Sequence, residues 1–205
     1  MRARRLVLGA ALAGIAAAGY RERTDPSPCP WAQRWLLHVP RPGLTPGRLR
    51  QILEPVPGER MLELGPGDGY HSPHVAGWIG PDGTLKAVDI QEKMLESLMS
   101  RARKLGITNI SPTVADAREL PFPDASFDAA YLVTVLGEVP DQAAALRELR
   151  RVLKPSGRLV VGEIPPLDPH FVSFGALRER AEREGFTFDR RLGPSLSYFA
   201  RFRPS

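Results

Sequence analysis

Cysteine is almost absent from the 205-residue chain, because Cys29 is the only one. This excludes an intramolecular disulfide and a metal site built from several thiolates. The four histidines, His38, His71, His74 and His170, are scattered, and although His71 and His74 share one helix face, no third ligand completes a metal motif. We therefore expect no metal site, and the composition is compatible with a reducing compartment.

Lysine is scarce as well, since only four of the 28 basic residues are lysine. The formal net charge is +5 and the isoelectric point is about 9.8, a balance that would suit a nucleic acid or an anionic membrane surface. However, the arginines of residues 147–151 and 178–183 alternate with glutamates at helical spacing, as on a solvated helix face. Nucleic-acid binding is therefore disfavoured.

Long apolar runs are also missing, and the longest stretch without a charged residue is residues 6–20. A helix of this length measures about 22 Å, which is shorter than the roughly 30 Å hydrocarbon core of a bilayer. Arginines flank the stretch on both sides, so charge does not set an orientation. Three interpretations stay open: a membrane tether or interfacial helix, a cleaved signal peptide, and a soluble packed helix.

Glycine, in contrast, is concentrated at one place, where the apolar run from Met61 is followed by Gly65, Gly67 and Gly69. A short apolar run bounded by turn residues is typical of a buried parallel strand, and glycines after it let the backbone approach a ligand closely. The next apolar run ends in Asp89, 20 residues after Gly69, and a carboxylate at that distance accepts hydrogen bonds from ribose hydroxyls. The pattern predicts a site for an adenosine derivative.

Two phosphate-binding fingerprints are absent from this region. The third glycine of the dinucleotide motif is replaced by Tyr70, which disfavours a pyrophosphate. No Gly-x-x-x-x-Gly-Lys-Ser/Thr sequence is present. The chain therefore lacks the phosphate loop of nucleotide hydrolases, and this function is disfavoured.

Several segments, in this order, resemble the successive motifs of class I S-adenosylmethionine-dependent methyltransferases. The similar segments are Glu63–Gly69, Ala87–Ile90, Val114–Ala117, Phe127–Asp128 and Leu153–Leu159. The resemblance covers about residues 58–164 and is closest to the type 11 branch, which includes the quinone-ring methylases. It implies an enzyme that uses S-adenosylmethionine to methylate a small, lipophilic acceptor.

Strands alternate with helices from Gly58 onward, which predicts an α/β, doubly wound and mostly parallel sheet. The resemblance implies seven strands, the last of them antiparallel. The expected strands are 60–64, 84–89, 110–115, 127–135, 157–164, 186–191 and 197–203, and the expected helices are 45–53, 71–79, 91–105, 141–153 and 173–184.

Three regions are expected along the chain: an apolar N-terminal segment (1–23), a proline-rich linker (24–43) and the methyltransferase domain (44–205). The resemblance implies a cytoplasmic enzyme, because S-adenosylmethionine is made and used in the cytosol. A membrane tether through residues 6–20 is therefore preferred to an exported precursor.

By the same resemblance, eight residues contact or support the cofactor: the glycine loop holds the methionine part, and residues that end the next strands hold ribose and adenine. They are Glu63, Gly65 and Gly67 in the loop, Asp89 and Ile90 at ribose and adenine, Asp116 and Ala117 at the adenine edge, and Thr134. For Asp116 a turn or helix-cap role is the alternative.

Gly137 and Glu138 occupy the positions where many relatives carry a Leu-His-His-like sequence facing the acceptor. Glu138 is the best-placed candidate base for a protic acceptor, and its alternative role is an exposed acid near a helix N-terminus. Tyr70, His71 and His74 are further candidates.

Two other functions stay open from the sequence. An NAD-dependent oxidoreductase is opposed by Tyr70 and by the lack of a Tyr-x-x-x-Lys pair. A non-catalytic S-adenosylmethionine-binding protein would share the cofactor site. The Asn-Pro-Pro-Tyr sequence of base and glutamine methylases is absent, which weakens nucleic-acid methylation, and the oligomeric state is not predicted.

Overall fold

The computed structural model describes residue 28, residues 43–165 and residues 170–205. The stretch 6–20, Cys29 and His38 therefore lie outside the described residues. The expected boundaries at residues 23 and 43 stay predictions.

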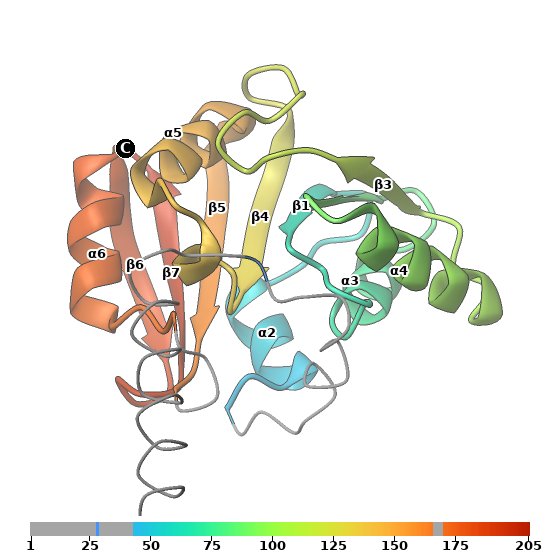
Figure 1. The fold of residues 1–205 in the computed structure, drawn as a ribbon, viewed down its shortest axis with the longest axis horizontal. Coiled ribbons are helices and arrows are strands. Elements are labelled where there is room, and N and C mark those ends of the chain that lie inside the picture. Colours follow the sequence, from blue (N-terminus) through green and yellow to red (C-terminus); the bar gives the residue numbers. More distant parts are fainter. Residues whose placement is uncertain (1–27, 29–42, 166–169) are drawn as a thin grey trace, which may run out of the picture.

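Seven strands form one sheet in the order β3-β2-β1-β4-β5-β7-β6, which runs across Figure 1. The strands are β1 (Arg60–Leu64), β2 (Thr84–Asp89), β3 (Ile110–Val114), β4 (Phe127–Val133), β5 (Leu153–Glu163), β6 (Phe186–Leu192) and β7 (Tyr198–Pro204). Strands β1 to β5 pair in parallel, whereas β7 is antiparallel to both β5 and β6. The predicted fold class is confirmed.

Helices cover both faces of the sheet because successive strand residues point to opposite sides. On β1, Met61 packs with one buried cluster and Leu62 with the other. The Met61 cluster includes residues of α2 (Pro46–Leu53), α3 (Ser72–Ile79) and α4 (Glu92–Lys104), and the Leu62 cluster includes residues of α5 (Gln142–Val152) and α6 (Phe174–Arg183). Each face of the sheet is thus shielded from water.

Helix α2 begins as expected, with Thr45 as N-cap and Pro46 in its first turn. Its last carbonyl groups are bound by arginines from the sheet: Arg201 Nη1 donates to Ile52 O at 3.0 Å, and the Arg158 side chain donates to Leu53 O. These bonds satisfy carbonyls that a helix end leaves without intrahelical partners. They also fasten α2 to β5 and β7.

Two strands differ from the expected ranges by more than one residue at an end. Strand β4 ends at Val133, two residues early, because Thr134 has a φ of 56° and a 3₁₀ turn, η2 (Leu136–Glu138), follows. Strand β5 begins at Leu153, directly after α5, and its pairing with β4 shifts register before Arg158. Residues 154–156, which lie between the expected helix and strand, are therefore an irregular part of the strand.

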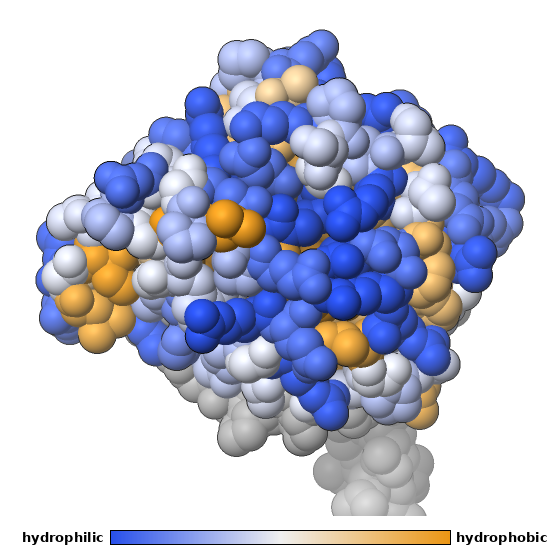
Figure 2. Space-filling model, turned by 180° about the vertical axis from the view of Figure 1, so that it is seen from behind, coloured by the Kyte–Doolittle hydropathy of each residue, from blue (hydrophilic) through white to orange (hydrophobic). Residues whose placement is uncertain are grey.

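The surface seen in Figure 2 is largely hydrophilic, with apolar residues in separate spots. Large apolar side chains that are more than half exposed in the described part are Val56, Ile90, Leu105, Val114 and Leu196. Among the described residues, no helix is long and apolar enough to cross a membrane.

Candidate active site

A pocket lies at the carboxyl ends of β1, β2, β3 and β4, where the strand order reverses beside β1. Ligands of doubly wound sheets bind at this position. The pocket encloses about 1170 Å³ of empty space, including its open mouth. The eight residues predicted for the cofactor and the leading candidate base line it: Glu63, Gly65, Gly67, Asp89, Ile90, Asp116, Ala117, Thr134 and Glu138.

The glycine loop needs glycine for two reasons. Gly65 and Gly67 have φ angles of 62° and 56°, a region that side chains disfavour. A Cβ atom on Gly65 would also lie 2.4 Å from Val135 Cγ2, so a side chain there would clash with the pocket wall. The loop backbone therefore forms part of the floor of the pocket.

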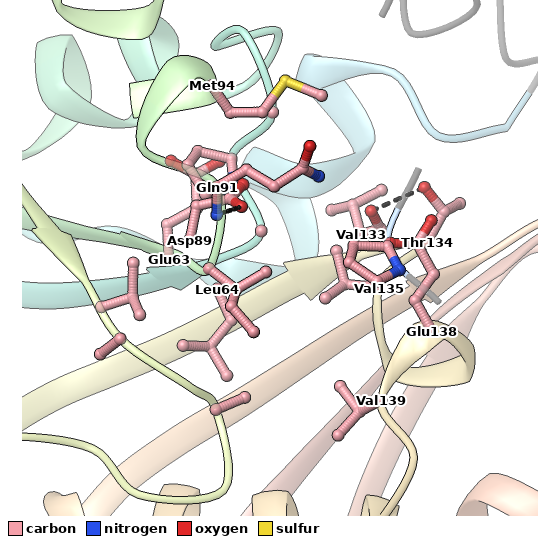
Figure 3. Close-up of a pocket in the computed structure, with 18 of the residues that line it drawn as sticks. Glu63, Leu64, Asp89, Gln91, Met94, Val133, Thr134, Val135, Glu138 and Val139 are labelled. Carbon is pink, nitrogen blue, oxygen red and sulfur yellow. Dashed lines mark hydrogen bonds between the residues drawn. The ribbon is translucent and has the colours of Figure 1, made fainter. Parts of the chain in front are cut away.

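Asp89 ends β2 beside this loop (Figure 3). Its Oδ1 accepts a hydrogen bond from the Gln91 N–H at 2.9 Å. Burial raises the pKa of Asp89, and the backbone N–H groups of Gln91, Gly67 and Ile90 oppose that rise. The N–H groups hold the carboxylate in place at the pocket wall, as a ribose-binding acid requires.

Glu63 is buried in β1, with 4% of its surface exposed. Burial raises its pKa to about 7, the hydroxyls of Ser72 and Tyr131 lower it, and the negative charge of Asp89 raises it. Tyr131 is its direct neighbour in β4. Glu63 therefore faces polar groups from three elements below the glycine loop.

Asp116 forms an ion pair with Arg118, a residue that the sequence analysis did not identify. Arg118 Nη2 lies 2.6 Å from Asp116 Oδ2, and the Arg118 backbone N–H donates to Oδ1 at 2.8 Å. The Arg118 guanidinium lowers the pKa of Asp116. Arg118 also lines the pocket, so the predicted adenine contact would have to share this carboxylate with the arginine.

The other side of the pocket is formed by the end of β4 and the η2 turn (Figure 3). Thr134 adopts a left-handed conformation that is rare for a β-branched residue, and such strain tends to occur at functional sites. Glu138 ends η2, is partly buried and lies beside the apolar Val135 and Val139. The N-cap of α5 is Asp141, whose Oδ1 accepts from Ala144 N at 2.9 Å, so Glu138 is not the cap.

The residue before Glu138 is a glycine for a steric reason. A Cβ on Gly137 would lie 1.8 Å from the carbonyl oxygen of His170, so only glycine fits there. Of the other candidate bases, Tyr70 and His71 line the pocket. His74 is exposed, stacks on Trp78 with ring centroids 6.2 Å apart, and is not among the lining residues.

Sequence reasoning missed several lining residues. Gln91 and Met94 come from the start of α4, and Arg118 from the connection after β3. Pro28, in the expected linker, also lines the pocket. The sequence held one local signal for these lining residues, which is that Gln91 follows Asp89 by two positions.

Residues 62–161 match the family model described as a methyltransferase domain. The ubiquinone/menaquinone biosynthesis C-methyltransferase UbiE of Pasteurella multocida is 38% identical over 133 residues, which are 61% of this chain and 50% of that protein. The enzyme of the same name from Proteus mirabilis is 41% identical over 114 residues, 54% of this chain and 45% of the relative. The chain thus spans about half the length of the curated relatives it matches.

Two solved structures share the fold. A SAM-dependent methyltransferase from Aquifex aeolicus superposes with a TM-score of 0.78 at 22% identity, covering 86% of this chain and 98% of that one. The [4+2]-cyclase SpnF superposes with a TM-score of 0.69 at 20% identity, covering 78% of this chain and 80% of that one. At these identities the likeness concerns the fold.

Proposed function

We propose that this chain is a class I methyltransferase of the type 11 branch, and that it transfers a methyl group from S-adenosylmethionine to a small, lipophilic acceptor. One observation carries the proposal: a single pocket joins the glycine loop and Asp89 to an apolar wall that ends in Glu138. Cofactor and acceptor would therefore meet at the end of β4.

The residues of the loop side fit this cofactor. Val135 leaves no room for a side chain at Gly65. The backbone of the loop would therefore face the ligand directly. We assign the methionine part to Gly65 and Gly67, the ribose to Asp89, and the adenine to Ile90, Asp116 and Ala117. The sulfonium of the bound cofactor would supply an activated methyl group, so the chain needs chiefly to position the acceptor in line with it.

On the acceptor side, Val133, Val135, Val139 and Pro140 present an apolar surface next to Glu138. The matched relatives carry the name of quinone-biosynthesis C-methyltransferases, and a lipophilic ring would suit such a wall. For an acceptor that must lose a proton, we assign the role of base to Glu138. The acceptor atom is left open by this arrangement.

The purified chain should bind S-adenosylmethionine and S-adenosylhomocysteine in calorimetry, and should not bind NAD. A deletion strain should accumulate an unmethylated metabolite, and its lipid extract should accept labelled methyl groups when the protein and labelled cofactor are added. Failure to bind either adenosyl ligand would refute the proposal.

A non-catalytic or non-methylating role is the second candidate. The fold is shared with a [4+2]-cyclase, which shows that fold alone does not name a reaction. Cofactor binding without transfer to any component of the deletion-strain extract would favour this second role. An oxidoreductase is set aside, because the matched family is a methyltransferase domain.

For the cell, we propose a cytoplasmic enzyme held at the membrane by residues 6–20. Support comes from the sequence: a stretch without charged residues is flanked by arginines, and a lipophilic acceptor would reside in the bilayer. A short helix rich in alanine and glycine gains little transfer energy, so release by high salt or high pH is expected.

A further inference from the structure

The η2 turn, which carries Glu138, is too short to keep its shape without support. The turn has three residues and is closed by the amides of Glu138 and Val139, which donate to carbonyl oxygens three positions earlier at 2.9 and 3.2 Å. Fixing several backbone angles for so few bonds is unfavourable in isolation. The left-handed Thr134, which lies beside Glu138 in Figure 3, adds strain just before the turn. Neighbouring elements must therefore hold Glu138 at the pocket wall.

One such element is the strap, which we define as residues 170–173, directly before α6. The carbonyl oxygen of His170 lies so close to Gly137 that a Cβ there would come within 1.8 Å of it. Val172 is 4% exposed and belongs to the same buried cluster as Leu136 of the turn. The strap therefore backs the turn through one close backbone contact and a shared apolar core.

Two buried polar side chains of the sheet hold Val172. The Tyr198 hydroxyl donates to Val172 O at 2.8 Å, and Val172 N donates to Glu163 Oε2 at 3.5 Å. Tyr198 and Glu163 are direct partners across β7 and β5, and both are fully buried. Burying a hydroxyl and a carboxylate costs free energy that an apolar pair would avoid, unless each has a hydrogen-bond partner. Holding the strap is a role that accounts for both groups at this place.

We propose that Tyr198, supported by Glu163, is a positioning residue for the acceptor side of the pocket: it fixes the strap, and the strap holds the η2 turn that carries Glu138. Tyr198 is not among the residues that line the pocket, so its effect passes through the strap. Of the two bonds to Val172, the one from Tyr198 is the shorter and has the larger share in this role. The proposal rests on the proposed function only for the part that Glu138 plays.

Amide hydrogen exchange of the full chain without ligand tests the link between Tyr198 and the turn. Tyr198→Phe keeps the buried ring and removes the hydroxyl, so the bond to Val172 O is lost. We expect exchange at the Glu138 and Val139 amides to quicken by about tenfold, the order expected when a segment that opens locally loses one buried hydrogen bond.

Asn109→Ala is the matched control. Asn109 Nδ2 donates to Ala76 O at 2.9 Å and to Gly80 O at 2.8 Å, at the end of α3. Ala76 belongs to the buried cluster on the opposite face of the sheet from Val172. This variant loses hydrogen bonds of similar length, so it should lower stability without quickening exchange in the η2 turn.

Methyl transfer gives the second measurement. With labelled S-adenosylmethionine at saturation and the deletion-strain lipid extract as the source of acceptor, Tyr198→Phe should transfer about tenfold more slowly, because the base is displaced. Its Kd for S-adenosylmethionine should stay at the wild-type value. Glu163→Leu should behave in the same way, whereas Glu163→Gln should restore transfer, because its amide oxygen can still accept from the Val172 N–H.

The outcomes keep this proposal apart from the proposed function. Wild-type protein that binds neither adenosyl ligand contradicts the proposed function, whereas the exchange measurement needs no ligand. Exchange in η2 that is unchanged in Tyr198→Phe, or equally quickened in Asn109→Ala, overturns the positioning role. Wild-type transfer in Tyr198→Phe, or transfer lost together with cofactor affinity, overturns it as well. A glutamine variant with the defect of Glu163→Leu overturns the part of Glu163.

Discussion

Two carboxyl groups on adjacent strands, Glu63 and Asp89, respond to burial in different ways. Three backbone N–H groups face Asp89 and support its charged form. Glu63 has only hydroxyls as near partners, and burial raises its pKa to about 7. At the scale of single residues, the backbone thus equips Asp89 to bind as an anion, while Glu63 is able to change its charge near neutral pH.

Replacing Asp89 by alanine should weaken S-adenosylmethionine binding by about 1.5–3 kcal/mol, because charge-assisted hydrogen bonds to ribose are lost. Calorimetry measures the change. Asp82→Ala, at an exposed acid outside the pocket lining, is the matched control and should bind normally. Undiminished affinity in Asp89→Ala would remove the ribose assignment.

Glu63 should make the ligand-free protein less stable as the pH rises. An acid whose pKa is raised on folding, here from 4.5 to about 7, stabilises the fold fully below pH 4.5 and loses that contribution as the pH rises to about 7. Glu63→Gln lacks this titration. Its free energy of unfolding, relative to wild type, should therefore increase by about 3 kcal/mol between pH 4.5 and pH 8.

Denaturant unfolding at several pH values measures this difference. A constant difference between variant and wild type across the range would show that Glu63 ionises normally in the folded protein.

Glu138→Gln should lower turnover on an identified protic acceptor by about 10²-fold or more, with S-adenosylmethionine affinity close to wild type. The reason is that the amide cannot accept the proton, while the apolar wall stays in place. Equal turnover in both proteins would show that Glu138 is not the base. Catalysis would then depend on positioning alone or on His71. Steady-state kinetics combined with calorimetry distinguishes these results.

At the scale of elements, helix α2 depends on side chains from distant strands. Arg201 is 5% exposed and binds Ile52 O, Glu54 and Asp189. Arg158 adds an ion pair with Glu59 at 2.7 Å. Since the helix has only eight residues, tertiary contacts and not its own length stabilise it.

Arg201→Met should destabilise the protein by about 2–4 kcal/mol, because two carboxylates and a helix carbonyl lose their buried partner. Arg183→Ala removes an exposed pair with Glu179 on α6 and should cost at most about 0.5 kcal/mol. Thermal or denaturant unfolding of both variants provides the comparison. Similar losses in the two proteins would contradict the role of Arg201 in fastening α2.

At the scale of the whole molecule, the described catalytic unit from residue 43 onward contains the complete seven-stranded sheet and nearly all of the pocket lining. Of the described lining residues, Pro28 precedes it. The membrane proposal for residues 6–20 rests on their sequence.

Deleting residues 1–23 should give a folded protein that still binds S-adenosylmethionine but no longer partitions with membranes. Cell fractionation, thermal unfolding and calorimetry measure the three properties. Full-length protein found wholly in the soluble fraction, or a truncated protein without a thermal transition, would show that the stretch is no tether.

The sequence by itself determined the order of strands and helices, the glycine loop and the acid that ends β2. These features depend on local chemistry: strand burial follows apolar runs, and the loop follows from glycine spacing. The location of all nine site residues at one pocket followed as well, because the carboxyl ends of parallel strands meet at one edge of the sheet. Their individual roles stay predictions.

Only the tertiary structure decided where β4 ends, what engages Asp116, and what the arginines do. Thr134 turns left-handed where η2 begins, and Gly137 is needed because the backbone at His170 passes against it. Arg201 reaches Ile52 across 149 positions of the chain. Such contacts join residues that are distant in sequence, so no local pattern encodes them, and they set the shape and charge of the pocket on which the proposed chemistry depends.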